Sequence, residues 1–164
     1  MKAVAEKVRG EFESRGVKLL VQDGSISRKV LLEVFRRDVH SVLFGLESFW
    51  SGIDVPGESL RHVIITRLPF PVPSHPISKA RMELLSERGE NSFTSYALPE
   101  AILKFRQGAG RLIRKNSDSG TITILDSRIT TKPYGRSFVQ SLARCPVDIM
   151  RPDGSIEEWV EPLL

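Results

Sequence analysis

Apolar residues along this chain fall into short continuous runs, and between the runs they recur at every third or fourth position. The runs are typical of buried strands, whereas the spaced pattern is typical of helices with one buried face. The predicted strands are residues 17–22, 41–46, 62–68 and 121–126. The predicted helices are residues 1–15, a segment that Ser27 can cap, residues 76–88, residues 99–115 and a helix after residue 131. This alternation predicts an α/β fold in which a parallel sheet carries helices on both faces.

Ligands bind such sheets at the carboxyl ends of the strands. The segment FWSGIDVPG, residues 49–57, follows the second predicted strand, and residues 126–128 follow the fourth. Both segments are therefore candidates for a binding site.

Composition narrows the class of protein. The 164 residues are enough for one domain with a substantial core, and 40% of them are hydrophobic. We expect no contact with a membrane, because the chain has no apolar run of about 18 residues. The single cysteine, Cys145, cannot form an internal disulfide and favours a cytoplasmic protein. His40, His62 and His75 are scattered, so no metal site is predicted.

The net charge of +4 is unevenly distributed. No carboxylate occurs between Glu100 and Asp118. The cations in that gap are Lys104, Arg106, Arg111, Arg114 and Lys115. Such a block suits an anionic partner, either a nucleotide phosphate or a nucleic-acid backbone. A solvated helix face is the alternative that charge alone leaves open.

The helix predicted over residues 99–115 contains Gly108 and Gly110, and an interior glycine costs about 1 kcal/mol relative to alanine. The predicted apolar face spans about 100° and consists of Ile102, Phe105, Ala109, Leu112 and Ile113. Gln107, Arg111 and Arg114 fall within about 60° of one another on the opposite side. The glycines would let another surface approach closely, and guanidinium groups are suited to phosphoryl groups.

The pattern Q-x-x-G-R-x-x-R at residues 107–114 resembles motif VI of superfamily 2 helicases, the arginine-finger motif of the second RecA-like domain. The ordered segments FWSGIDVPG, VIITRLPFPVPSHP, SFTSYALPEAILKFRQGAGRLIR, ILDSR and KPYGRSFVQSL resemble the DinG-type branch of XPD-like DNA helicases, up to about Leu142. The resemblance implies a RecA-like fold of the P-loop NTPase type. It also implies a helicase domain at residues 1–143, followed by a tail at residues 144–164 that packs on the domain or extends it.

The resemblance further implies the roles of individual residues in ATP binding. Gln107 and Arg111 would lie near the γ-phosphate, with Gly110 in the same motif. Arg114 would be the arginine finger on ATP and Mg²⁺ held mainly by a preceding RecA-like domain. Gly52 and Asp54 match motif V, which links the nucleotide to DNA, and the Asp54 carboxylate would accept from a ribose hydroxyl or an interdomain arginine. Capping of the VPG turn is the alternative for Asp54.

The same resemblance implies a path for single-stranded DNA. The DNA-binding residues on it would be Phe49, Trp50, Ser51, Arg67 and Arg128. The aromatic rings at positions 49 and 50 could instead belong to the core, and Arg128 could be an ordinary solvated arginine.

Departures from the family pattern limit what the chain does by itself. It has no G-x-x-x-x-G-K-[ST] loop and no acidic pair after a strand to hold Mg²⁺. The resemblance places any iron–sulfur cluster in the preceding half, since Cys145 alone cannot bind one. We therefore expect part of a 5′→3′ DNA helicase that does not hydrolyse ATP alone. A stand-alone, non-catalytic nucleic-acid-binding module and a gene fragment are the alternatives.

The start of the chain gives one more expectation. In the family, a strand carrying motif IV precedes the first helix, and here no apolar strand precedes Met1, Val4, Val8 and Phe12, the expected buried face of that helix. The sheet would then lack its first strand, leaving an interior slot with unpaired backbone groups and a partly exposed helix face. On this expectation, Met1 is an internal methionine of a longer protein.

Overall fold

The computed structural model describes residues 1–49, 55, 59–112, 119–142 and 145–159. The helices are α1 (Lys2–Ser14), α2 (Arg28–Arg37), α3 (Pro76–Glu87), α4 (Leu98–Ala109), α5 (Arg128–Thr131) and α6 (Gly135–Gln140), with a 3₁₀ turn η1 (Glu47–Phe49) and a π-helical turn η3 (Phe93–Ala97). The strands are β1 (Lys18–Val21), β2 (Ser41–Phe44), β3 (His62–Ile65), β4 (Thr121–Ile124), β5 (Asp148–Met150) and β6 (Ile156–Glu158).

The strands β1 to β4 pair in parallel, which confirms the predicted α/β class. β1 pairs with β2 and places Lys18 opposite Ser41, and β3 pairs with β4 and places His62 opposite Thr121. The sequence predicts a parallel sheet with an interior slot where one strand is missing, and among the described residues these strands form two separate two-stranded sheets. The separation follows the packing, because each pair of strands has a hydrophobic core of its own.

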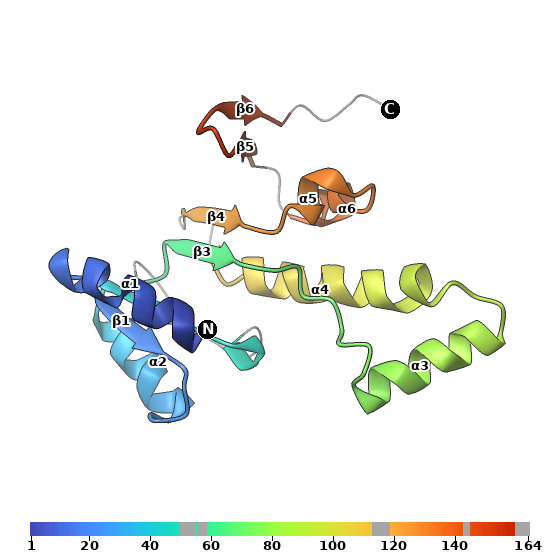
Figure 1. The fold of residues 1–164 in the computed structure, drawn as a ribbon, viewed down its shortest axis with the longest axis horizontal. Helices are drawn as coiled ribbons and strands as arrows, with labels where there is room; N and C mark the ends of the chain where they lie inside the picture. The colour runs from blue at the N-terminus through green and yellow to red at the C-terminus, as the bar shows by residue number, and fades with distance from the viewer. Residues whose placement is uncertain (50–54, 56–58, 113–118, 143–144, 160–164) are drawn as a thin grey trace.

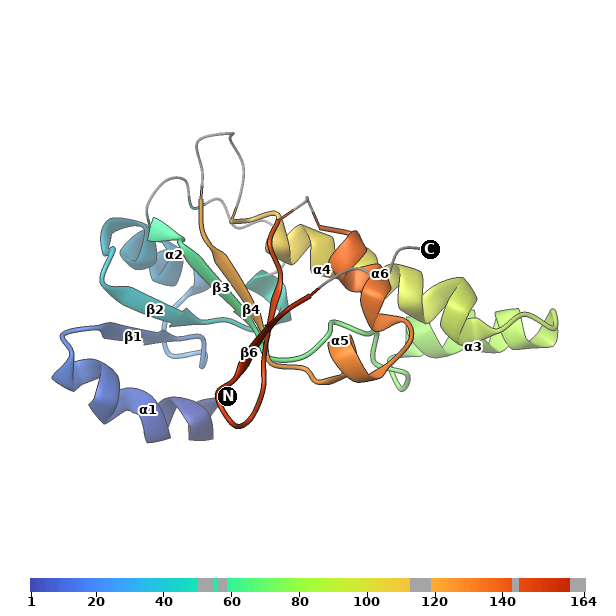
Figure 2. The same ribbon diagram turned by 90° about the horizontal axis from the view of Figure 1, so that it is seen from above.

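The first core lies around β1 and β2, which run between α1 and α2 (Figures 1 and 2). Leu20, Leu31 and Phe35 are buried there, and Ser27 caps α2 as predicted, its hydroxyl oxygen accepting from the Val30 N–H. The apolar face of α1 is partly exposed, as expected for a helix whose neighbouring strand is missing. Ala5 is the buried residue of this helix, Val8 and Phe12 are half-buried, and Met1 and Val4 are 40% and 55% exposed.

The second core lies around β3 and β4. It contains Ile65 at the end of β3, Leu68 after that strand, Phe105 from α4 and Phe138 from α6. The helices α3 and α4 extend away from the strands as a helical hairpin (Figure 1). This core therefore ties the two strands to α4 and α6.

The end of α4 differs from the prediction. The helix ends at Ala109, not near Lys115, and Gly110 caps it by donating its N–H to the Arg106 carbonyl at 2.8 Å. The next two N–H groups reach back only three residues, from Arg111 to Gly108 and from Leu112 to Ala109. Two closely spaced glycines weaken the last turn enough to end the helix here. The predicted apolar positions Phe105, Ala109 and Leu112 are nevertheless buried.

Residues after 144 form an antiparallel hairpin of β5 and β6. Gly154 takes a positive φ of 84° in the connecting turn, and Arg151 pairs with Glu157 across it. The predicted division between residues 143 and 144 stays a prediction. In the described part of the chain, no helix is long and apolar enough to cross a membrane.

Candidate nucleotide and nucleic-acid site

Apart from Phe49, the candidate side chains that the structure describes lie at two opposite ends of β3 and β4. The turn after α4 reaches the amino ends of the two strands. Leu112 in this turn packs closely on Gly120, the residue before β4, because a Cβ added to Gly120 would lie only 2.7 Å from a Leu112 methyl group. The same Cβ would lie 2.5 Å from the carbonyl oxygen of Arg61, the residue before β3. Leu68 and Asp126, which follow the two strands, meet at the carboxyl ends. Gln107 and Arg111, the motif VI side chains that the structure describes, therefore lie toward the amino ends of this strand pair, and the candidate DNA contacts Arg67 and Arg128 lie toward its carboxyl ends.

At the amino ends, Gln107 is exposed in the last turn of α4 and Arg111 is half-buried in the turn that follows. Because the helix ends at Ala109, Arg111 does not continue the helical arc predicted for it. Gly110 lies at this end, where a side chain would meet the Arg106 carbonyl oxygen at 3.0 Å. The carboxyl end of a helix attracts cations, so this turn is a favourable place for a guanidinium group. Arg114 lies outside the described residues.

Phe49 belongs to the first core. Its side chain is 7% exposed and packs with the buried side chains of α2, and the Arg28 guanidinium lies 5.4 Å from its ring centroid. This burial leaves the ring no free face for a nucleic-acid base. Trp50, Ser51, Gly52 and Asp54 lie outside the described residues.

Gln22 is a further residue beside the candidate motif V segment, and the sequence-based prediction did not include it. It follows β1, and its side chain bridges to the segment after β2. The amide nitrogen donates to the Ser48 hydroxyl at 2.8 Å, and the amide oxygen accepts from the Leu46 N–H at 2.8 Å. The Gln22 N–H also donates to the Phe44 carbonyl at 2.9 Å. Gln22 thus fixes the backbone that leads into the motif V segment, and a polar residue directly after an apolar strand was the available signal.

The buried Asp126 pairs with the partly exposed Arg128 at the carboxyl ends of β3 and β4. Asp126 is 8% exposed and accepts hydrogen bonds from two nitrogens of the Arg128 side chain, from Nε at 2.9 and 3.2 Å and from a terminal nitrogen at 2.6 Å. It also accepts from the N–H groups of Arg128 at 3.1 Å and of Leu68 at 2.9 Å. The exposed Arg67 directly precedes Leu68, so Asp126 anchors the backbone that carries Arg67.

These hydrogen bonds predict a dependence of stability on pH. The Arg128 side chain, more than any other group, lowers the pKa of Asp126 from 3.8 to about 2. A depressed carboxyl pKa contributes stability above pH 4 that is lost as the pH falls toward 2. We expect a contribution of about 1–2 kcal/mol, since Arg128 is partly screened by water. Urea unfolding at pH 6 and pH 2.5 should show this loss for the wild type and less of it for Asp126→Asn. An equal loss in both proteins would contradict the assignment.

Within the described residues, no three His, Cys, Asp or Glu side chains come together as a metal site would require.

Comparison with known proteins assigns this arrangement to a family. Residues 1–145 match the family described as "Helicase C-terminal domain". The chain belongs to this family. The resemblance to DinG-type helicases that the sequence motifs indicate is thereby confirmed, and the chain is a helicase C-terminal domain.

Several curated relatives share the domain. A Bacillus subtilis protein named 3'-5' exonuclease DinG is 41% identical over 163 residues, which cover 98% of this chain and 17% of the relative. The ATP-dependent DNA helicase YoaA of Haemophilus influenzae is 42% identical over 142 residues, covering 87% of this chain and 22% of the relative. The protein of the same name from Escherichia coli is 40% identical over 146 residues, which cover 89% of this chain and 22% of the relative. The chain thus spans about a fifth of the length of these relatives.

Proposed function

We propose that this domain is the C-terminal motor domain of an ATP-dependent DNA helicase with 5′→3′ polarity. The observation that carries the proposal is the separation of two functional ends on one strand pair, with the cationic turn after α4 at one end and the Asp126-anchored segment at the other. The names of the Haemophilus and Escherichia relatives support ATP-dependent action on DNA. Such a role would place the protein in the cytoplasm with the chromosome.

In this proposal the nucleotide is shared with a preceding RecA-like domain, which holds most of ATP and Mg²⁺. Gln107 and Arg111 approach the γ-phosphate from the end of α4, and Arg114 stabilises the charge that develops as the phosphoryl group is transferred. Gly110 leaves space for the neighbouring domain, and Gly52 and Asp54 belong to the link between nucleotide and DNA. These residues supply charge and orientation, whereas the metal ion neutralises the phosphates.

The DNA strand follows the carboxyl ends of the strands. Arg67 is exposed there and available for phosphates, and Trp50 and Ser51 are the other proposed contacts. Phe49 is not included, because its ring is buried. The Arg128 guanidinium donates hydrogen bonds to Asp126, which in turn holds the segment that carries Arg67. We therefore assign Arg128 to positioning this segment. The strand pair β3–β4 then joins the nucleotide end to the DNA end as one rigid unit.

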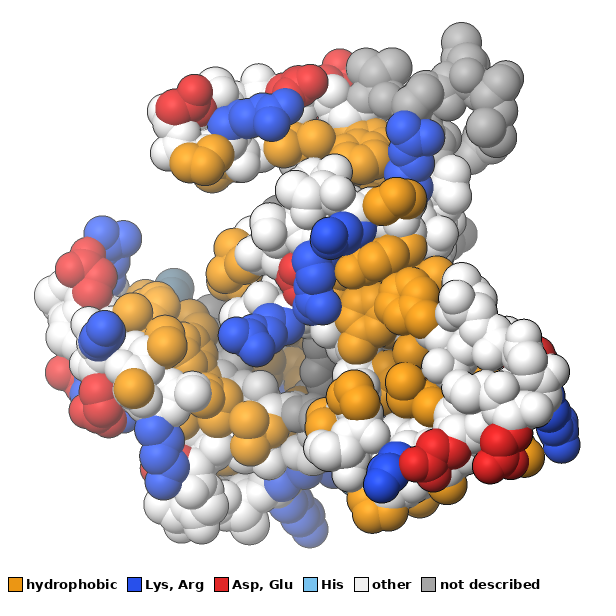
Figure 3. Space-filling view, turned by 45° about the vertical axis from the view of Figure 1, so that its right-hand side comes forward, with side chains coloured by type: hydrophobic (Ala, Val, Ile, Leu, Met, Phe, Trp, Pro, Cys, Tyr) orange, Lys and Arg blue, Asp and Glu red, His pale blue; other side chains and the backbone are white. Residues whose placement is uncertain are grey.

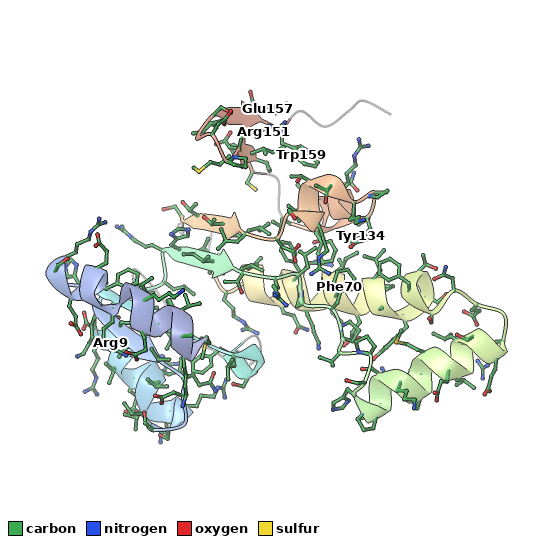
Figure 4. The ribbon with its side chains drawn as sticks, viewed as in Figure 1. Arg9, Phe70, Tyr134, Arg151, Glu157 and Trp159 are labelled. Atoms are coloured by element: carbon green, nitrogen blue, oxygen red, sulfur yellow. The ribbon has the colours of Figure 1, made fainter. Side chains whose placement is uncertain are left out.

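Binding of single-stranded DNA by this chain tests the DNA part of the proposal. We expect weak, sequence-independent binding that falls steeply with salt, because phosphate contacts release counterions. Arg67→Ala should weaken binding equally for all sequences and reduce the slope of log K against log salt by about one. Arg9→Ala is the matched control, since Arg9 lies on α1 and pairs with Glu6 (Figure 4). An affinity that is the same at low and physiological salt would count against the proposal.

A further inference from the structure

A cluster of aromatic rings lies beside the proposed DNA end, and the roles proposed so far do not use it. The rings come from three separate parts of the chain: Phe70 follows β3, Phe93 begins η3, and Tyr134 lies between α5 and α6. Phe70 lies 5.7 Å from Phe93 and 5.6 Å from Tyr134, and Phe93 lies 5.3 Å from Tyr134, all between ring centroids. Figure 4 shows Phe70 and Tyr134 side by side next to α5.

The cluster reaches the surface at Phe93. Phe138 closes the inner side of the cluster, with its ring 5.7 Å from Phe70, and it has no exposed surface. Phe70 and Tyr134 are half-buried, whereas Phe93 is 36% exposed. Phe70 stacks on the Phe93 ring at an interplanar angle of 23°, and the Tyr134 ring lies against it at a tilt of 55°, so two rings hold Phe93 in place while part of it stays exposed. The exposed part of the Phe93 ring is available to a planar group.

The surroundings of the cluster are cationic. The Arg128 guanidinium lies 5.2 Å from the centre of the Phe70 ring, and Arg67 is exposed three residues before Phe70. The segments that carry Phe70 and Tyr134 contain no carboxylate from residue 61 to 82 or from 127 to 147. Asp126 is neutralised by its pair with Arg128, and Glu90 is the carboxylate nearest to Phe93 along the chain. Figure 3 shows hydrophobic side chains gathered in one area of this face, with Lys and Arg side chains along its border.

Exposed aromatic rings bordered by cations are the combination that binds single-stranded nucleic acid, because a base stacks on a ring while a phosphate meets a cation. We propose that Phe93, supported by Phe70 and Tyr134, is a stacking site for one base of the DNA strand whose phosphates Arg67 contacts. The inference rests on the proposed function, since it adds a base-stacking position to the same DNA path. Asp126 contributes indirectly, because its bond to the Leu68 N–H fixes the segment between Arg67 and Phe70.

A comparison of two oligonucleotides with equal numbers of phosphates tests this proposal. One is oligothymidylate of about 12 nucleotides, and the other is an abasic strand of the same length. Both contact Arg67 in the same way, but only the first offers bases for stacking. We expect the wild-type chain to bind oligothymidylate about 5- to 100-fold more tightly at low salt. Phe93→Leu should abolish most of this preference while the salt dependence stays, and Phe93→Tyr should keep it.

Leu84→Ala, at an exposed apolar position on α3, is the control and should bind both strands like the wild type. Circular dichroism of each variant shows whether Phe93→Leu preserves the fold, and Phe93→Tyr gives an independent result if it does not. Equal binding of the two oligonucleotides by the wild type, or an unchanged preference in Phe93→Leu, would overturn the stacking site and leave the phosphate contacts intact. Failure to bind either strand at low salt would overturn the stacking site together with the proposed DNA path.

Discussion

Replacing Arg114 by alanine should reduce ATP hydrolysis by about 10³- to 10⁵-fold in an enzyme that contains this domain joined to its preceding half. The reason is electrostatic. Charge accumulates on the transferred phosphoryl group in the transition state, and a guanidinium held beside it stabilises that charge in a site with little water. DNA affinity and folding should remain, because Arg114 is proposed to act on the nucleotide. The measurement is the steady-state rate of phosphate release at saturating ATP and DNA.

The neighbouring cation Lys115 gives a matched control for this variant. Lys115→Ala removes the same charge one residue further along the chain, and we expect its rate to stay within a few-fold of the wild type. Arg114→Lys should restore little of the rate of ATP hydrolysis that Arg114→Ala loses, because a lysine cannot donate two hydrogen bonds in the planar arrangement of a guanidinium. If Arg114→Ala lowers turnover less than tenfold, or if Lys115→Ala lowers it equally, Arg114 is not the arginine finger.

The largest effect on stability is expected from Phe138→Ala. Phe138 has no exposed surface, and its ring meets Phe105 edge-on at 5.3 Å and Phe70 at 5.7 Å. Removing a fully buried phenylalanine ring costs about 3–5 kcal/mol, from lost burial and from the cavity left behind. Domains of this size are stable by about 5–15 kcal/mol, so this loss removes a substantial part of the total stability.

Urea unfolding followed by circular dichroism measures this loss. The midpoint should fall by at least about 1 M for a slope of 1–3 kcal/mol/M. Leu103→Ala on α4 is the control, since Leu103 is about half exposed and its loss should cost less than about 1 kcal/mol. A Phe138→Ala midpoint close to that of Leu103→Ala would mean that the second core is not packed as described.

Local patterns predict most elements of this fold, because each strand and helix carries its own spacing of apolar residues. The end of α4 shows where such a pattern misleads. Apolar spacing continues to Leu112, but the backbone leaves the helix at Gly110 and the turn still returns Leu112 to the core. Leu112 is therefore buried without being helical. Only the low helix propensity of the two glycines indicated that the helix would end before it.

The functional residues differ in how far a sequence can reveal them. The Asp126–Arg128 segment lies at the carboxyl ends of the strands, as its position after an apolar run predicts. The anchoring of Leu68 by Asp126 joins positions 58 residues apart, so no local pattern could reveal it. Phe49 illustrates the same limit. The sequence leaves open whether its ring contacts DNA or belongs to the core, and its packing against α2 places it in the core.

Hydrolysis of ATP by a chimeric protein tests the central claim most directly. The chimera is the E. coli relative named ATP-dependent DNA helicase YoaA, with its matching segment replaced by this domain. We predict that the chimera hydrolyses ATP in a DNA-stimulated manner, that its Arg114→Ala variant does not, and that this chain alone releases no phosphate. A chimera that folds and binds DNA but hydrolyses no ATP would contradict the account, and so would DNA-stimulated hydrolysis by a homogeneous preparation of this chain alone.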